Sequence, residues 1–172
     1  TSSLSITAIA SVLKHPERMA GLHFFNPAPV MKLVEVIRGL ETAENVIEIL
    51  KTLTLSFNKI PVICHSTPGF IVNRVARPFY AEALRALEEQ VGNPATLDSI
   101  MRDAGGFSMG PLQLTDLIGH DVNYAVTESM FQAFGYDPRF QTAFAQLALV
   151  QAGHLGRKSG RGFYDYTADN HD

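Results

Sequence analysis

The chain has 172 residues, of which 46% are hydrophobic and 18% are charged, and its formal net charge is −3. This composition is typical of a globular protein that is long enough to bury a substantial core. The negative charge argues against a general nucleic-acid binder, because such proteins carry basic patches. No run approaches the ~18 consecutive apolar residues that a membrane span needs. We therefore expect neither a nucleic-acid partner nor a membrane segment.

The cysteine content and the first residue bear on compartment and completeness. Cys64 is the only cysteine, so no internal disulfide can form, and a reducing compartment is expected. We predict a cytoplasmic location, and an organellar matrix fits equally. No spacing of histidine, cysteine and carboxylate residues resembles a metal site. Because the chain begins without methionine and in the middle of a structural pattern, we expect a fragment or a processed chain.

Strand-like and helix-like segments alternate in the first part of the chain. The pattern predicts a short helix over 3–13 that begins near a serine cap, strands over 19–26, 31–39 and 60–65, and a helix over 41–59. This alternation indicates an α/β layer. The predicted buried face of the second helix contains Val46, Ile47, Leu50, Leu53 and Leu55.

From Thr67 onward the strand signal stops and only helices are predicted. A long helix is expected over 67–90, with Thr67 as its cap, Pro68 in its first turn and Pro78 inside it. Its predicted apolar face contains Ile71, Val72, Val75, Phe79, Ala83 and Leu87. Further helices are predicted over 93–105, starting at an Asn–Pro cap, over 110–135, with a break near Gly119, and over 138–153. Residues 155–172 read as a glycine-rich basic turn, an aromatic hook and a polar end. We place the domain boundary near 65–69, which gives domains 1–66 and 67–172.

Two polar side chains in the first pair of strands stand out. The connector between these strands has about six residues, too few for a parallel crossover, so the strands should be antiparallel. If they fold about Pro29, residues whose numbers sum to 58 face one another, and His23 and Glu35 form such a pair. Facing side chains have Cβ atoms about 4.5–5.5 Å apart. The carboxylate can then hold one imidazole nitrogen and leave the other for acid–base chemistry. The plainer alternative is a core histidine and a surface glutamate.

Four blocks of the sequence resemble one enzyme family. They are GLHFFNPAPVMKLVEV (21–36), STPGFIVNR (66–74), MGPLQLTDLIGHD (109–121) and LGRKSGRGFYDY (155–166). Together they resemble the later part of the L-3-hydroxyacyl-CoA dehydrogenases, in order and over essentially the whole chain. The last block is most similar to bacterial members that act in phenylacetate breakdown, on 3-hydroxyadipyl-CoA or 3-hydroxybutyryl-CoA.

The resemblance implies a fold, ligands and site residues. The fold would be an α/β remnant, the end of a Rossmann-type dinucleotide-binding domain, followed by an all-α dimerisation domain. NAD is the implied cofactor, an acyl-CoA thioester the implied substrate, and a homodimer the implied assembly. The matching positions imply that His23 and Glu35 are catalytic, that Ser2 and Asn73 contact the substrate, and that Asn26, Lys158 and Ser2 lie at the cofactor.

The implied reaction is the reversible oxidation of an (S)-3-hydroxyacyl-CoA to the 3-oxoacyl-CoA. His23 would take the hydroxyl proton while hydride leaves C3 for the nicotinamide, and Glu35 would stabilise the imidazolium. Ser2 and Asn73 would orient the reacting oxygens. The family's G-x-G-x-x-G phosphate loop is not in this sequence, and GGFSMG (105–110) follows a helix instead of a strand. We therefore predict that this chain alone binds NAD poorly and shows negligible turnover.

Plainer interpretations stand beside these assignments. Ser2 fits a helix cap, Asn73 fits a tolerated polar position on a helix, and the GRKSGR turn (156–161) fits a solvated basic loop. Asp116 and His120 are expected to hydrogen-bond within the helical domain without a chemical role. For the whole chain, one alternative is a non-catalytic dimerisation or scaffold module of a larger protein. Another is a related β-hydroxyacid dehydrogenase that acts on free acids.

Overall fold

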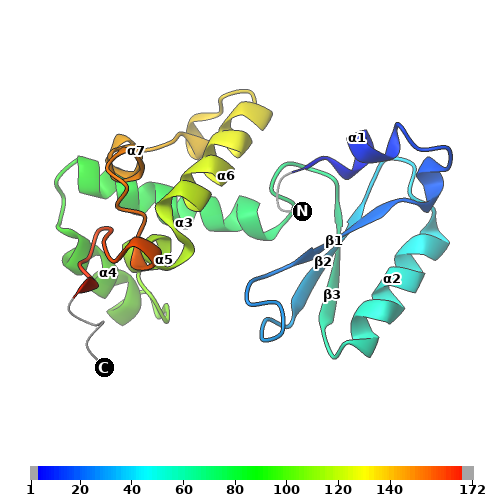
Figure 1. Cartoon of the computed structure of the whole chain (residues 1–172), viewed down its shortest axis with the longest axis horizontal. Helices are drawn as coiled ribbons and strands as arrows, with labels where there is room; N and C mark the ends of the chain where they lie inside the picture. The colour runs from blue at the N-terminus through cyan, green and yellow to red at the C-terminus, as the bar shows by residue number, and fades with distance from the viewer. Residues whose placement is uncertain (1–3, 168–172) are drawn as a thin grey trace. The chain divides into compact units, whose positions relative to one another are not determined.

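The chain forms two compact units in the computed structural model, which describes residues 4–167. The units divide between Arg74 and Val75, within helix α3 (Val72–Glu88). The first unit combines a β-sheet with helices, and the second is helical (Figure 1). None of the helices in residues 4–167 combines the length and the apolar character that crossing a membrane requires.

The first unit is built on a three-stranded sheet of order β1-β2-β3. Its strands are β1 (Ala20–Phe24), β2 (Leu33–Arg38) and β3 (Ile60–His65). The pair β1–β2 is antiparallel, and β2–β3 is parallel. Helix α2 (Glu44–Ser56) makes the crossover that a parallel pair needs, and it packs against all three strands (Figure 1). The predicted α/β layer is therefore present.

A short helix and an apolar cluster close this unit. The predicted serine cap is confirmed, because the Ser5 hydroxyl accepts a hydrogen bond from the Ala8 N–H at the start of α1 (Ile6–Ala10). Helix α1 packs against β1 and β2, and a 3₁₀ turn (Pro16–Arg18) follows it. The core cluster contains Ile6, Ile37, Cys64 and Phe70, with Met19 packed against it.

The predicted buried face of α2 is only partly correct. Ile47 is buried, but Leu53 and Leu55 are 40% and 56% exposed. The buried residue between them is Thr54, which lies seven positions after Ile47 and therefore on the same side of a helix with 3.6 residues per turn. Its hydroxyl donates to the Leu50 carbonyl at 2.7 Å, so the polar group is satisfied inside the helix.

The predicted start of α3 is wrong. Thr67 does not cap a helix, and Pro68 does not lie in a first helical turn; residues 67–70 form a β-turn in which the Phe70 N–H donates to the Thr67 carbonyl at 3.0 Å. Gly69 has a φ of 72°. Proline followed by a glycine with positive φ is characteristic of a type II turn, which interrupts the helical pattern. The helix begins at Val72.

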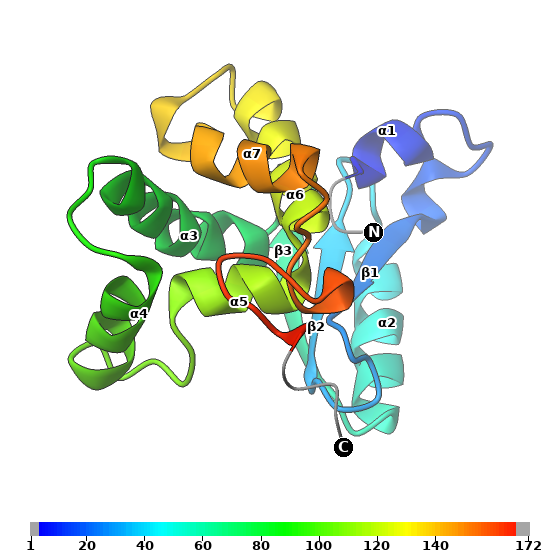
Figure 2. The ribbon, with the colours of Figure 1, turned by 60° about the vertical axis from the view of Figure 1, so that its left-hand side comes forward.

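The second unit packs short helices against one another. Besides most of α3 it contains α4 (Pro94–Asp103), α5 (Pro111–Ile118), α6 (His120–Ala133) and α7 (Phe144–Gln151), with 3₁₀ turns at Pro138–Phe140 and Arg157–Ser159. Helix α5 packs against both α4 and α6, and α7 packs against α6 (Figure 2).

Two predicted features of this unit are confirmed. The Asn93 side chain caps α4 by accepting the Thr96 N–H at 2.9 Å. The helix predicted over 110–135 breaks at Gly119, whose φ of 101° ends α5 and starts α6. The glycine is suited to this position because it adopts positive φ without a side-chain clash.

Two other predictions are corrected here. Val75, expected on the buried face of α3, is 71% exposed, and Ile71 is 39% exposed. Arg77 is buried instead, because its guanidinium donates to the Asn123 carbonyl and the Thr127 hydroxyl. The last helix begins at Phe144 and not at Pro138, because Asp137 accepts the Arg139 N–H and closes a separate 3₁₀ turn.

Candidate active site

His23 and Glu35 face each other across the antiparallel strands β1 and β2. Their pairing has the predicted register. The imidazole Nδ1 lies 2.7 Å from Glu35 Oε2, and the two residues are only 6% and 1% exposed. A carboxylate only accepts hydrogen bonds, so Nδ1 carries the shared hydrogen. The pair therefore satisfies two polar groups that would otherwise be costly to bury.

The second oxygen of Glu35 is bound by the backbone before and at the start of α3. Oε1 accepts the N–H groups of Ile71 and Val72, each at 2.9 Å. Burial raises the pKa of Glu35, but the hydrogen bonds from His23 and from these two N–H groups outweigh it. The pKa of Glu35 therefore lies below its ordinary value, and the carboxylate is ionised at neutral pH.

The other imidazole nitrogen of His23 is available for chemistry. Within residues 4–167, Nε2 makes no hydrogen bond. Aromatic rings flank the imidazole: the Phe25 ring centroid is 4.5 Å away and that of Phe70 is 5.8 Å away. An imidazole held through Nδ1, with a lone pair on Nε2, has the geometry of a general base.

The remaining predicted site residues lie in different parts of the chain. Asn26 is exposed two residues after the end of β1 and precedes Pro27 through a cis peptide bond. Asn73 is half-buried and follows Val72 in α3, next to the Glu35 contact. Lys158 belongs to the second unit, where its Nζ lies 2.6 and 2.7 Å from the Asp121 carboxylate oxygens. Ser2 lies outside the described residues.

Two supporting contacts were missed from the sequence. The backbone N–H groups of Ile71 and Val72 bind the Glu35 carboxylate, and the Pro68–Gly69 dipeptide was the available signal, since it marks a turn in place of a helix. Lys59 Nζ donates to the carbonyls of Ala28 and Met31 at 2.6 and 2.8 Å, which pins the connector between β1 and β2. No spacing in the sequence signals that contact.

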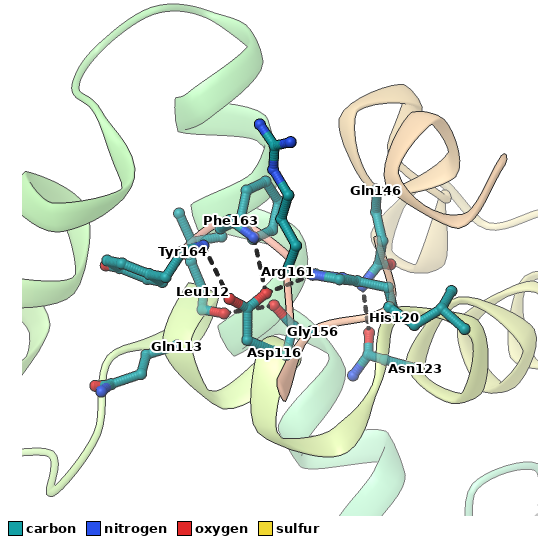
Figure 3. Close-up of polar contacts among 12 residues, drawn as sticks. Leu112, Gln113, Asp116, His120, Asn123, Gln146, Gly156, Arg161, Phe163 and Tyr164 are labelled. Atoms are coloured by element: carbon teal, nitrogen blue, oxygen red, sulfur yellow. Dashed lines mark hydrogen bonds and ion pairs between the residues drawn. The ribbon is translucent and has the colours of Figure 1, made fainter. Parts of the chain in front are cut away.

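The second unit contains another buried histidine–carboxylate pair. His120 Nε2 lies 2.6 Å from Asp116 Oδ1, and both side chains are fully buried (Figure 3). The same carboxylate accepts the N–H groups of Phe163 and Tyr164 and the Tyr166 hydroxyl. The predicted hydrogen bonding of Asp116 and His120 within the helical unit is thus present.

This pair ties the C-terminal segment to α5. Burial raises the pKa of Asp116, but hydrogen bonds from His120, Phe163 and Tyr164 bring it below the ordinary value. The other His120 nitrogen, Nδ1, lies 3.3 Å from the Gln146 amide nitrogen, which also bonds Asn123 Oδ1 (Figure 3). Because both imidazole nitrogens are committed, His120 has no nitrogen left for a substrate.

The sequence matches two consecutive family models. Residues 1–67 match the NAD binding domain of 3-hydroxyacyl-CoA dehydrogenase, and residues 69–166 match the C-terminal domain of the same enzyme. The chain belongs to the 3-hydroxyacyl-CoA dehydrogenase family. The predicted membership is therefore confirmed, and the chain combines a Rossmann-like NAD-binding domain with the family's helical C-terminal domain.

Curated members and a solved structure of this family are similar over nearly the whole chain. A 3-hydroxyadipyl-CoA dehydrogenase of Escherichia coli K12 is 65% identical over 169 residues, which are 98% of this chain and 36% of the relative. A probable 3-hydroxybutyryl-CoA dehydrogenase of Deinococcus radiodurans is 42% identical over 166 residues, 96% of this chain and 59% of the relative. A crystal structure of an E. coli K12 3-hydroxybutyryl-CoA dehydrogenase covers all of this chain and 36% of its own, with a TM-score of 0.96 and 64% identity. The chain thus spans between about a third and three fifths of these relatives.

Proposed function

We propose that this chain carries the proton-transfer site of an NAD-dependent dehydrogenase that oxidises (S)-3-hydroxyacyl-CoA to 3-oxoacyl-CoA. The observation that carries the proposal is the buried His23–Glu35 pair, in which Nδ1 is held at 2.7 Å and Nε2 is available. His23 Nε2 accepts the proton of the substrate hydroxyl, and Glu35 stabilises the resulting imidazolium. Asn73 and Ser2 are proposed to orient the reacting oxygens, and Asn73 follows the backbone that binds Glu35.

We propose that this chain binds NAD mainly at the nicotinamide end of the cofactor. NAD, when bound, supplies the hydride acceptor. Asn26, an exposed amide three residues after His23, is proposed to lie at the nicotinamide, whose carboxamide matches its hydrogen-bonding groups. Lys158 is proposed to bind the cofactor, which would require it to share or leave Asp121. The sequence contains no G-x-G-x-x-G for the pyrophosphate, so we expect weak NAD binding by this chain alone.

Domain division, assembly and location are part of the same proposal. We propose an NAD-binding portion over residues 1–66, the end of a Rossmann-type domain, and a helical domain over 67–172. The helical domain is proposed to form a homodimer, which the exposed Val122 and Phe144 side chains support. The single cysteine supports a cytoplasmic location. The names of the relatives suggest 3-hydroxyadipyl-CoA and 3-hydroxybutyryl-CoA as substrates to test first.

The test is His23→Gln in the full-length protein, with His15→Gln as a matched control. His15 also pairs with a glutamate, Glu17 at 3.3 Å, but that pair is on the surface. Removing a general base typically lowers the rate about 10²–10⁴-fold. We expect His23→Gln to lower kcat for 3-hydroxyacyl-CoA oxidation by that amount and His15→Gln to leave it near wild type. Sedimentation should show the same dimer for both.

Three results would contradict the proposal. Undiminished oxidation by the His23→Gln protein would show that His23 is not the general base. Activity on free 3-hydroxy acids and not on their CoA thioesters would point to a β-hydroxyacid dehydrogenase. Dimerisation without activity in the wild-type full-length protein would favour the scaffold alternative.

A further inference from the structure

Phe70 has a backbone conformation that a residue with a side chain rarely adopts. Its φ is 48°, in the left-handed region, and the preceding Gly69 has a φ of 72°. Glycine adopts this region freely, whereas for phenylalanine it costs conformational energy and persists only when the surroundings fix it. The Phe70 ring is in the core cluster with Ile6 and Ile37, and the residue is 4% exposed. The packed ring thus holds a backbone geometry that is unfavourable by itself.

The consequence of that geometry lies in the next two residues. The N–H groups of Ile71 and Val72 point at the same oxygen, Glu35 Oε1, at 2.9 Å each. Successive N–H groups that follow such a turn form a concavity for an anion. They also include donors that the first turn of α3 leaves without a helical partner. The left-handed residue therefore directs two backbone donors onto a buried carboxylate.

The side chain of Phe70 contacts the other member of the pair. Its ring centroid lies 5.8 Å from that of His23, at an interplanar angle of 60°. One residue therefore acts on both partners, through its backbone on Glu35 and through its ring on His23. We propose that Phe70 is a positioning residue: its left-handed backbone fixes Glu35 Oε1 on α3, which leaves Oε2 aimed at His23 Nδ1. The catalytic consequence of this role rests on the proposed function, but the geometry does not.

A simple packing role makes a different prediction. If Phe70 only fills the core, the effect of a substitution should follow the volume and apolarity of the new side chain. Leucine and isoleucine are isomers with the same apolar atoms. Isoleucine is branched at Cβ, and a β-branched residue at positive φ is a genuine outlier. Comparison of the two isomers therefore separates the backbone conformation from the packing.

The experiment compares Phe70→Leu with Phe70→Ile in the 172-residue chain. The Glu35 carboxyl ¹³C resonance is followed through a pH titration, and ¹⁵N spectra report which imidazole nitrogen of His23 carries hydrogen. We expect Phe70→Leu to keep the pKa of Glu35 below its ordinary value, as in wild type. Phe70→Ile should raise the pKa of Glu35, because the two N–H donors move away. Identical Glu35 titrations in the two folded isomers would overturn the proposal.

A third variant covers the case in which Phe70→Ile does not fold. Phe70→Gly removes the ring but adopts the left-handed conformation freely. The proposal expects it to keep the pKa of Glu35 low and hydrogen on His23 Nδ1, despite a loss of packing and a lower Tm. A Glu35 pKa at its ordinary value in folded Phe70→Gly would contradict the backbone role.

Kinetics of the full-length protein test the catalytic consequence separately. Misplacement of a catalytic group by about 1 Å can cost about 10²-fold in rate. Phe70→Ile is expected to lower kcat about 10- to 100-fold with little change in KM, and Phe70→Leu should stay near wild type. Equal kcat values for the Phe70→Leu and Phe70→Ile proteins would show that Phe70 does not influence catalysis, even if Glu35 titrates as expected. A failure of the proposed function itself would appear instead as an active His23→Gln protein, and the ¹³C titration would be unaffected.

Discussion

The fate of the second imidazole nitrogen distinguishes the two buried histidine–carboxylate pairs. His23 is hydrogen-bonded to Glu35 through Nδ1, and its Nε2 has no hydrogen bond within the described residues. His120 is hydrogen-bonded to Asp116 through Nε2, and its Nδ1 lies next to the Gln146 amide. A base needs a free lone pair, so of these two histidines His23 alone has the arrangement of a general base. Burial and hydrogen-bond length do not distinguish the pairs. Both pairs are buried, and their nitrogen–oxygen distances are 2.7 and 2.6 Å.

The structural role of the second pair predicts a large loss of stability in Asp116→Asn. Asp116 accepts hydrogen bonds from four groups, and an amide would direct hydrogens at some of these donors. Removal of one partner of a buried charged pair typically costs about 3–5 kcal/mol. We expect a decrease of that order in the free energy of unfolding, measured by urea titration.

The matched control is Asp121→Asn on the next helix. Asp121 pairs with Lys158, but both side chains are more than 40% exposed. Exposed pairs contribute about 0–1 kcal/mol, so this variant should unfold near the wild-type urea concentration. A similar loss in both variants would mean that burial of the Asp116 pair is not what matters.

At the scale of elements, patterns with a fixed period were predictable and turns were less so. The register of His23 and Glu35 follows from a connector too short for a crossover and from a fold about Pro29, which places residues whose numbers sum to 58 opposite one another. The start of α3 was predicted wrongly, since Thr67 and Pro68 resemble a helix cap, whereas the Pro68–Gly69 dipeptide forms a turn in which Gly69 has positive φ. The exposure of Val75 and the contact of Lys59 depend on the packed structure, which local sequence does not encode.

The contact between α5 and the C-terminal segment requires two close backbone approaches. A Cβ at Gly162 would collide with the Asp116 carboxylate, and a Cβ at Gly156 would collide with the Asp116 backbone. Glycine is therefore needed at Gly162 for space, since its φ is not in the left-handed region. These approaches bring the backbone of the glycine-rich segment directly against Asp116 of α5.

Gly162→Ala should consequently destabilise the helical unit. Overpacking typically costs about 1–3 kcal/mol, and here the displaced group is a carboxylate that binds Phe163 and Tyr164. The control is Gly92→Ala, whose Cβ would meet Thr96 and Leu97 at an ordinary 3.5 Å. Thermal unfolding should show a lower Tm for Gly162→Ala only, and equal Tm values would contradict the close approach.

At the scale of the molecule, a buried carboxylate with a lowered pKa occurs in both units. Glu35 has this role in the first unit and Asp116 in the second. A carboxyl group with a lower pKa in the folded state binds fewer protons there than in the unfolded state. It therefore stabilises the fold above the unfolded-state pKa, and this stabilisation is lost as the pH falls through the folded-state pKa.

The expected result is a protein that loses stability below about pH 5, where unfolded carboxylates begin to bind protons. The free energy of unfolding is measured in urea at about pH 7 and about pH 4 for wild type, Glu35→Gln and the double variant with Asp116→Asn. The single variant should be less stable at the higher pH but should lose less on acidification, because one group no longer titrates. The double variant should lose least.

If all three proteins lose the same free energy between the two pH values, neither carboxylate is responsible for the acid sensitivity. If Glu35→Gln loses as much free energy as wild type and only the double variant loses less, the acid sensitivity comes from Asp116 in the helical unit and not from Glu35.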